Sequence, residues 1–186
     1  MKKKLEEIEL FELDTLDNIA IVDEPAIMID FMCFSKEKQY TFANEEKHIL
    51  TGPFLIPEMR ILRYDAQGEP YNIFFSKETV ERIAYSFMSN DKIHAFNLGH
   101  QEDTDKLTLI ESWVKTSDED KSAALGIDVP VGTWLGSVKV NDDSIWQDIK
   151  EGKYNGFSVA GLFTAENSEE DALLEKIKDL VSQWEE

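Results

Sequence analysis

The clearest β pattern in the chain lies in residues 107–113, Leu107-Thr108-Leu109-Ile110-Glu111-Ser112-Trp113. Successive side chains of a strand point to opposite faces of a sheet, so a period of two places Leu107, Leu109 and Trp113 on one face. Glu111 falls on the same apolar face, where a carboxylate needs a partner. The pattern predicts a half-buried strand over residues 106–114 that carries an acidic side chain inward.

Further runs rich in β-branched and aromatic residues occur on both sides of this strand. Pro53 and Pro57 interrupt one of them, and they predict bends or edge strands because proline cannot donate to a sheet ladder. The predicted strands are residues 18–22, 26–34, 40–42, 49–64, 71–75, 93–98, 106–114, 133–140 and 156–163.

Three amphipathic helices are predicted in addition. One begins at the N-cap Ser76 and ends near residue 90, and a second covers residues 143–151 before Gly152. The third begins at Ser168 and follows an acidic stretch. The chain therefore reads as α+β, mainly β, with one domain over residues 1–165 followed by an acidic linker and a C-terminal amphipathic helix over residues 166–186.

Composition excludes several classes of protein. The chain has 186 residues with 19 basic and 38 acidic side chains, and its net charge of −19 repels nucleic-acid phosphates and anionic lipid. A lone Cys33 and three histidines exclude a disulfide scaffold and a structural zinc site. No signal-like or membrane-spanning apolar run occurs, so we expect an intracellular, soluble protein with no nucleic-acid or membrane partner.

Ser158 is the serine whose setting is most unusual. It lies in Gly156-Phe157-Ser158-Val159-Ala160-Gly161, where small neighbours would let a substrate backbone approach. A plain strand between two glycines explains the same residues. The nucleophile elbow of α/β-hydrolases does not fit, because its second glycine comes one residue earlier and a helix follows its serine.

Two histidines and one acid could complete a site around a serine. If residues 93–100 form one strand, His94 and His100 point to the same side as Phe96 and Leu98. His100, at the strand end beside Gly99, can serve as a base. Glu111 could orient that imidazole, giving a His100, Glu111 and Ser158 triad. Alternatively, Glu111 pairs with a surface lysine on the other face of its sheet.

A metal site at residues 101–105 has less support in the sequence than the serine triad. A metal-assisted hydrolase would use His100 with Asp103 and Asp105, but the stretch lacks the glycine and terminal glutamate of an EF-hand loop. A solvated acidic loop explains these residues as well, and we expect no cofactor.

Several segments together resemble the prohead, or capsid-maturation, serine proteases of tailed phages, and especially the XkdF-like branch. The resemblance depends on the order and spacing of these segments more than on any one of them. The segments are Ile21-Val22-Asp23-Glu24-Pro25-Ala26, Gly52-Pro53-Phe54-Leu55-Ile56-Pro57, Phe74-Phe75-Ser76, Leu98-Gly99-His100, Ile110-Glu111-Ser112-Trp113, Val131-Gly132-Thr133-Trp134, and Gly152 with Gly156-Phe157-Ser158-Val159-Ala160-Gly161.

The resemblance implies a fold similar to the herpesvirus assemblins, a small, mostly antiparallel β-barrel flanked by helices. It implies a serine endopeptidase that cleaves scaffold and major capsid protein, and in some cases itself, inside the assembling procapsid in the host cytoplasm. The C-terminal helix is then a candidate surface for capsid, scaffold or a second copy of the chain. The rival hypothesis is a non-catalytic structural protein, associated with capsid or scaffold, that keeps the barrel.

On the same resemblance, His100 is the general base and Ser158 the nucleophile. An assemblin-type second histidine is excluded because no histidine follows Ser158. Glu111 is therefore the expected third member, with Asp128 or Glu166 behind it. Backbone amides around residues 159–161 are the expected oxyanion donors.

Overall fold

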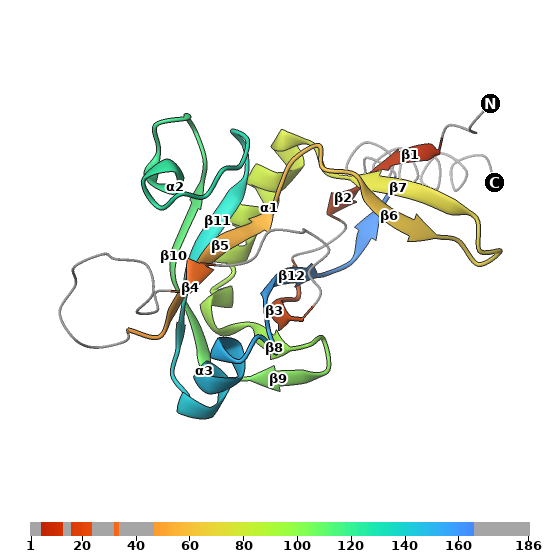
Figure 1. Cartoon of the computed structure of the whole chain (residues 1–186). Helices are drawn as coiled ribbons and strands as arrows, with labels where there is room; N and C mark the ends of the chain where they lie inside the picture. Colours follow the sequence, from red (N-terminus) through yellow and green to blue (C-terminus); the bar gives the residue numbers. More distant parts are fainter. Residues whose placement is uncertain (1–4, 13–15, 24–31, 34–46, 166–186) are drawn as a thin grey trace, which may run out of the picture.

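The structure is a computed structural model that describes residues 5–12, 16–23, 32–33 and 47–165 (Figure 1). These residues are mainly β, with the helices α1 (Lys77–Ser89), α2 (Lys121–Ala124) and α3 (Asp143–Lys150) and the 3-10 turn η1 (Lys92–His94). The predicted strand at 40–42, most of the one at 26–34, and the C-terminal segment 166–186 lie outside the described residues. The α+β class, mainly β, is confirmed.

The central sheet is antiparallel. Its order is β10 (Leu107–Val114), β11 (Trp134–Val140), β5 (Ile49–Leu55) and β4 (Met32–Cys33). Pro53 lies inside β5, and the register between β5 and β11 shifts directly after it, so that Phe54 is an extra residue. The bend expected at this proline is thus a β-bulge, and the next interruption, at Pro57, separates β5 from β6.

A second four-stranded sheet, called here the lateral sheet, lies beside it (Figure 1). Its order is β12 (Gly156–Ala160), β3 (Asn18–Val22), β8 (Phe96–Leu98) and β9 (Glu102–Thr104). β12 and β3 are antiparallel, β3 and β8 are parallel, and β8 and β9 form a hairpin. This sheet brings residues near 20, 97 and 158 into one register.

The remaining strands form two smaller sheets. β1 (Glu6–Glu9), β7 (Pro70–Phe74) and β6 (Ile61–Tyr64) make a three-stranded sheet, and β2 (Phe11–Glu12) pairs with β13 (Phe163–Thr164). The described strands therefore form open sheets, and the closed barrel that the resemblance implied is not observed among them. Where β5 and β12 meet, the Phe54 and Phe157 rings pack edge to face, with their centroids 4.8 Å apart.

The main core lies between the central sheet, the lateral sheet, α1 and α3. Phe54 is its hub, because its ring also meets Trp134 at 4.9 Å. Apolar side chains from all four elements are fully or nearly fully buried there: Leu50, Trp134 and Val138, Ile19, Ile21 and Phe157, Val80, Ile83 and Phe87, and Trp146 and Ile149. Burial of this apolar area is the main force that holds the two sheets together.

Gly136 allows this packing. A β-carbon at position 136 would overlap the Phe54 ring and lie 2.9 Å from the carbonyl oxygen of Glu111. The glycine therefore permits the close approach of β5, β10 and β11, and it gives Phe54 the space from which it reaches Phe157.

Most of the predicted elements are confirmed, with boundaries that differ locally. Ser76 caps α1 and Asp142 caps α3, each by accepting hydrogen bonds from main-chain amides in the first turn. The strand predicted at 93–98 begins only at Phe96, because η1 precedes it, and the one predicted at 156–163 stops at Ala160. None of the helices in the described part of the chain has the length and apolarity needed to cross a bilayer.

Candidate active site

Ser158 lies on the face of the lateral sheet that points away from the core. Its neighbour Phe157 is buried against Phe54, so alternation along β12 turns the Ser158 side chain outward. Ser158 pairs with Ala20 on β3, and Ala20 pairs with Asn97 on β8. Because paired residues share a face, Ser158 lies on the same face as Ala20 and Asn97, which are almost fully buried, whereas Ser158 itself is half-buried.

His100 lies in the tight turn that joins β8 to β9. The turn is closed by the Gln101 amide, which donates to the Leu98 carbonyl at 3.1 Å, and φ is positive at both central residues, 61° at Gly99 and 57° at His100. Positive φ at two central positions is the signature of a type I′ hairpin turn. The expectation that residues 93–100 form one strand with His94 and His100 on one side is therefore wrong.

The turn brings His100 to Ser158. Nε2 of His100 lies 2.9 Å from Oγ of Ser158, and the contact is open to solvent. With Nε2 unprotonated, the serine hydroxyl donates to it, which is the arrangement a general base needs to remove that proton. The two residues that the sequence singled out as base and nucleophile are within hydrogen-bonding distance.

A pair of carboxamides lies directly under the turn. Oδ1 of Asn97 accepts from the main-chain amide of His100 at 3.0 Å, and Nδ2 of Asn97 donates to Oδ1 of Asn18 at 2.8 Å. Neither asparagine was among the site residues predicted from the sequence. The signal present was Asn97 itself, a polar residue between Phe96 and Leu98 in an otherwise apolar run.

The structure does not bring Glu111 to His100. Oε2 of Glu111 accepts from Nζ of Lys121 and, at 2.7 Å, from Oγ of Ser137. These donors, Lys121 first, lower the pKa of the Glu111 carboxyl below its ordinary value. The observed arrangement is thus the alternative in which Glu111 pairs with a lysine.

The physical reason is a bulge in β10. Leu109 pairs with Val138 on β11 and Glu111 pairs with Ser137, so Ile110 is an extra residue with no partner of its own. One extra residue reverses the alternation beyond it. Glu111 consequently shares the face of Ser137, whereas Leu109 shares that of the buried Val138.

The other two acids do not complete a triad among the described residues. Asp128 is exposed between α2 and β11 and makes no hydrogen bond to His100, and Glu166 lies outside the described residues. Within the described ranges, no side chain is hydrogen-bonded to Nδ1 of His100.

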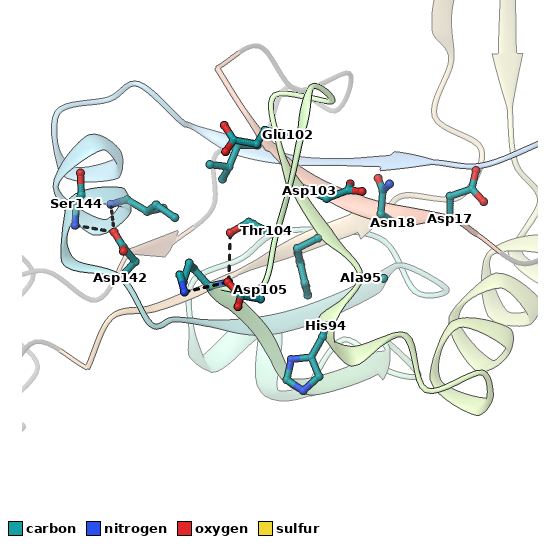
Figure 2. Close-up of a pocket in the computed structure, with 14 residues that line it drawn as sticks. Asp17, Asn18, His94, Ala95, Glu102, Asp103, Thr104, Asp105, Asp142 and Ser144 are labelled. Atoms are coloured by element: carbon teal, nitrogen blue, oxygen red, sulfur yellow. Dashed lines mark hydrogen bonds and ion pairs between the residues drawn. The ribbon is translucent and has the colours of Figure 1, made fainter.

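A cavity of about 880 Å³ opens beside the lateral sheet (Figure 2). Five carboxylates line it, from the start of β3, from the β9 hairpin and from the N-terminus of α3: Asp17, Glu102, Asp103, Asp105 and Asp142. Asn18 also lines it, whereas His100 and Ser158 do not, so the cavity adjoins the site through Asn18.

The described side chains give the metal alternative no support. No group of three His, Cys, Asp or Glu side chains within them is placed to hold a metal ion, and this includes His100, Asp103 and Asp105. Asp105 pairs instead with Lys106 at 3.0 Å.

Comparison with known proteins finds one relative and one matching family. The chain is 27% identical over 167 residues to the uncharacterized protein YqbD of Bacillus subtilis (strain 168). The alignment covers 83% of this chain but 46% of YqbD, so the chain spans about half the length of that relative. No solved structure matches significantly.

A family model described as "Putative phage serine protease XkdF" matches residues 38–169. The matched range contains both His100 and Ser158, and it covers well over half of the chain. On the extent of this match, the protein belongs to the phage serine protease family named for XkdF.

Proposed function

We propose that this chain is a serine endopeptidase that cleaves scaffold and major capsid protein, and itself, during maturation of a phage procapsid in the host cytoplasm. The observation that carries the proposal is the hydrogen bond between Nε2 of His100 and Oγ of Ser158, 2.9 Å long and accessible to solvent. Membership of a family of phage serine proteases supports the same chemistry.

The reaction follows from the roles of the two side chains. His100 takes the hydroxyl proton at Nε2 while Oγ of Ser158 attacks the carbonyl carbon of the scissile peptide. The resulting imidazolium gives its proton to the leaving amine as the C–N bond breaks. Water, deprotonated by the same imidazole, then hydrolyses the acyl-enzyme and restores the serine.

The surroundings of the pair fit a peptide substrate. β12 is an edge strand of the lateral sheet, and the residues that share the Ser158 face on β12 and β3 include Gly156, Ala160 and Ala20. The contact between Ser158 and His100 is exposed to solvent, so an extended peptide backbone can reach the serine hydroxyl from that side. The net charge of −19 also keeps the protein away from packaged nucleic acid. Backbone amides at residues 159–161 stay the predicted oxyanion donors.

The test is cleavage in the presence of the cognate shell proteins. The full chain is co-expressed with scaffold and major capsid protein, and intact masses are compared with those from Ser158→Ala. Ser117→Ala is the matched control, because Ser117 is an exposed serine of the loop between β10 and α2, which carries neither member of the pair. Fragments with the wild type and the control, but not with Ser158→Ala, support the proposal. Uncut proteins in assembled shells in every case would instead favour the structural role.

A further inference from the structure

The main-chain amide of His100 is held by the side chain of a buried asparagine. Asn97 is 5% exposed, and its Oδ1 accepts from the His100 amide at 3.0 Å. An amide N–H can only donate, so this bond fixes the orientation of the carboxamide and turns Nδ2 toward Asn18. Oδ1 of Asn18 accepts there at 2.8 Å.

We propose that Asn97 is a positioning residue, which holds the His100 turn so that the imidazole meets Ser158. The proposal rests on the proposed protease function. Asn97 acts through a hydrogen bond to the main chain of the base, and it touches neither the substrate nor the reacting atoms.

The register of the lateral sheet explains why this position can act on the base. Asn97 pairs with Ala20, and Ala20 pairs with Ser158, so the carboxamide and the nucleophile share one face across three strands. A bond from Asn97 to the His100 main chain therefore ties the base to the same sheet that carries the nucleophile. Asn18, on the neighbouring strand, fixes the carboxamide from its other end.

Closing the turn does not by itself require Asn97. The Gln101 amide already donates to the Leu98 carbonyl at 3.1 Å, and β9 continues the hairpin with Glu102 opposite Leu98. The Asn97 bond adds a constraint on His100 alone, the residue with φ of 57° in that turn. Loss of the Asn97 bond should therefore affect the placement of His100 more than the stability of the hairpin.

The experiment measures how fast a fluorophosphonate probe labels Ser158, since this needs no knowledge of the natural substrate. The full-length wild type, Asn97→Leu and Asn97→Asp are compared at equal folded protein, with the labelled residue located by mass spectrometry. Asn97→Leu removes the acceptor for the His100 amide, and the labelling rate should fall about 10- to 100-fold, as a misplaced catalytic group does. Asn97→Asp keeps an oxygen at the same place and should restore most of the rate.

Thr133→Val is the matched control. Thr133 is fully buried, and its hydroxyl donates to the Pro130 carbonyl in the segment before β11, outside the lateral sheet. It should lower stability without changing the labelling rate of the folded protein. If Asn97→Leu does not fold, Asn97→Ala takes its place in the same comparison.

The outcomes separate this proposal from the function on which it rests. Equal labelling of wild type and Asn97→Leu, or equally slow labelling of Asn97→Leu and Asn97→Asp, would overturn the positioning role while leaving the protease intact. A wild type that is not labelled at Ser158 would overturn the proposed function, and the positioning role with it.

Discussion

Nε2 of His100 lies 2.9 Å from Oγ of Ser158, although the two residues are 58 positions apart and the turn that carries His100 follows β8, a strand that does not pair with β12. β3 lies between them, and its Ala20 is opposite Ser158 on one side and Asn97 on the other. The site therefore depends on a third segment, Asn18–Val22, that supplies neither base nor nucleophile. The pairing of β3 with both outer strands sets their register, and Ala20 contributes only a methyl group to the face that they share.

His100→Asn should separate stability from activity. Asparagine tolerates positive φ better than most residues, so the turn at 57° should be preserved and the free energy of unfolding should change by less than about 0.5 kcal/mol. Labelling of Ser158 by the fluorophosphonate should fall about 10²- to 10⁴-fold, because the general base is lost. Urea unfolding and labelling kinetics on the same samples give both values.

His100→Ala provides the comparison for that variant. His100→Ala removes the general base just as His100→Asn does, but alanine is strained at positive φ. The substitution should therefore also lower the free energy of unfolding by about 1 kcal/mol. Labelling of His100→Asn at the wild-type rate would mean that His100 is not the base.

Glu111→Gln should leave the labelling rate close to that of the wild type. The carboxylate is bonded to Lys121 and Ser137, on the face of β10 that the bulge at Ile110 turns away from the main core. Removal of the acid from a working triad lowers the rate by about 10⁴-fold, which is easily distinguished from no change. A loss of that size in folded Glu111→Gln would restore Glu111 as the third member.

Glu166→Gln belongs in the same series, because Glu166 is the remaining acid of the three considered. If it orients Nδ1 of His100, its substitution should slow labelling of Ser158 strongly, whereas Asp128→Asn should not. Equal rates for all three variants would indicate a His100 and Ser158 pair that works without any of these acids.

The sequence predicted the parts of the site that depend on local pattern. Ser158 follows a core phenylalanine in a short strand, so alternation alone turns it outward, and His100 follows a glycine at a strand end. Both residues lie beside the glycines and small residues that distinguished them in the sequence, and their catalytic roles stay predictions. Residue chemistry and the family resemblance both grouped His100 with Ser158, but their contact depends on a parallel pairing of β3 with β8 across more than seventy residues, which no local pattern indicates.

Glu111 shows where pattern reasoning fails. A period of two places it with Leu107, Leu109 and Trp113, but one extra residue at Ile110 reverses the face for everything that follows. Ile110 is itself apolar, and it is 46% exposed. An apolar residue that lies in a bulge looks in the sequence like any other strand residue, so the reversal leaves no trace in the pattern.

The ion pair of Glu111 and Lys121 should make stability depend on pH. The lowered pKa of the Glu111 carboxyl means that its contribution is present above the unfolded value of about 4.5 and is lost as the pH falls through the folded value. The Glu111 side chain is 49% exposed, so we expect a contribution of only about 0.5 kcal/mol. Urea unfolding of wild type and Glu111→Gln at pH 6 and pH 3 measures it.

The difference between these two proteins should be largest at pH 6 and smaller at pH 3, because the carboxylate becomes protonated as the pH falls. Glu119→Gln is the matched control, since Glu119 is an exposed acid in the loop that follows β10 and makes no hydrogen bond to any described residue. A difference for Glu111→Gln that does not exceed that of Glu119→Gln at pH 6 would contradict a stabilising role for the pair.

Gly136→Ala should disturb the position of Ser158, although residue 136 does not contact the serine. The new methyl group would overlap the Phe54 ring, which packs on Phe157, the residue before the nucleophile. We expect the free energy of unfolding to fall by about 1–3 kcal/mol through overpacking, and the labelling rate of the remaining folded protein to fall as well, because β12 must move with Phe157. Gly68→Ala is the control: it strains the β6–β7 turn at φ of 80° but meets no atom within 4 Å, so it should lower stability alone. An unchanged labelling rate in folded Gly136→Ala would show that Phe54 does not set the position of Ser158.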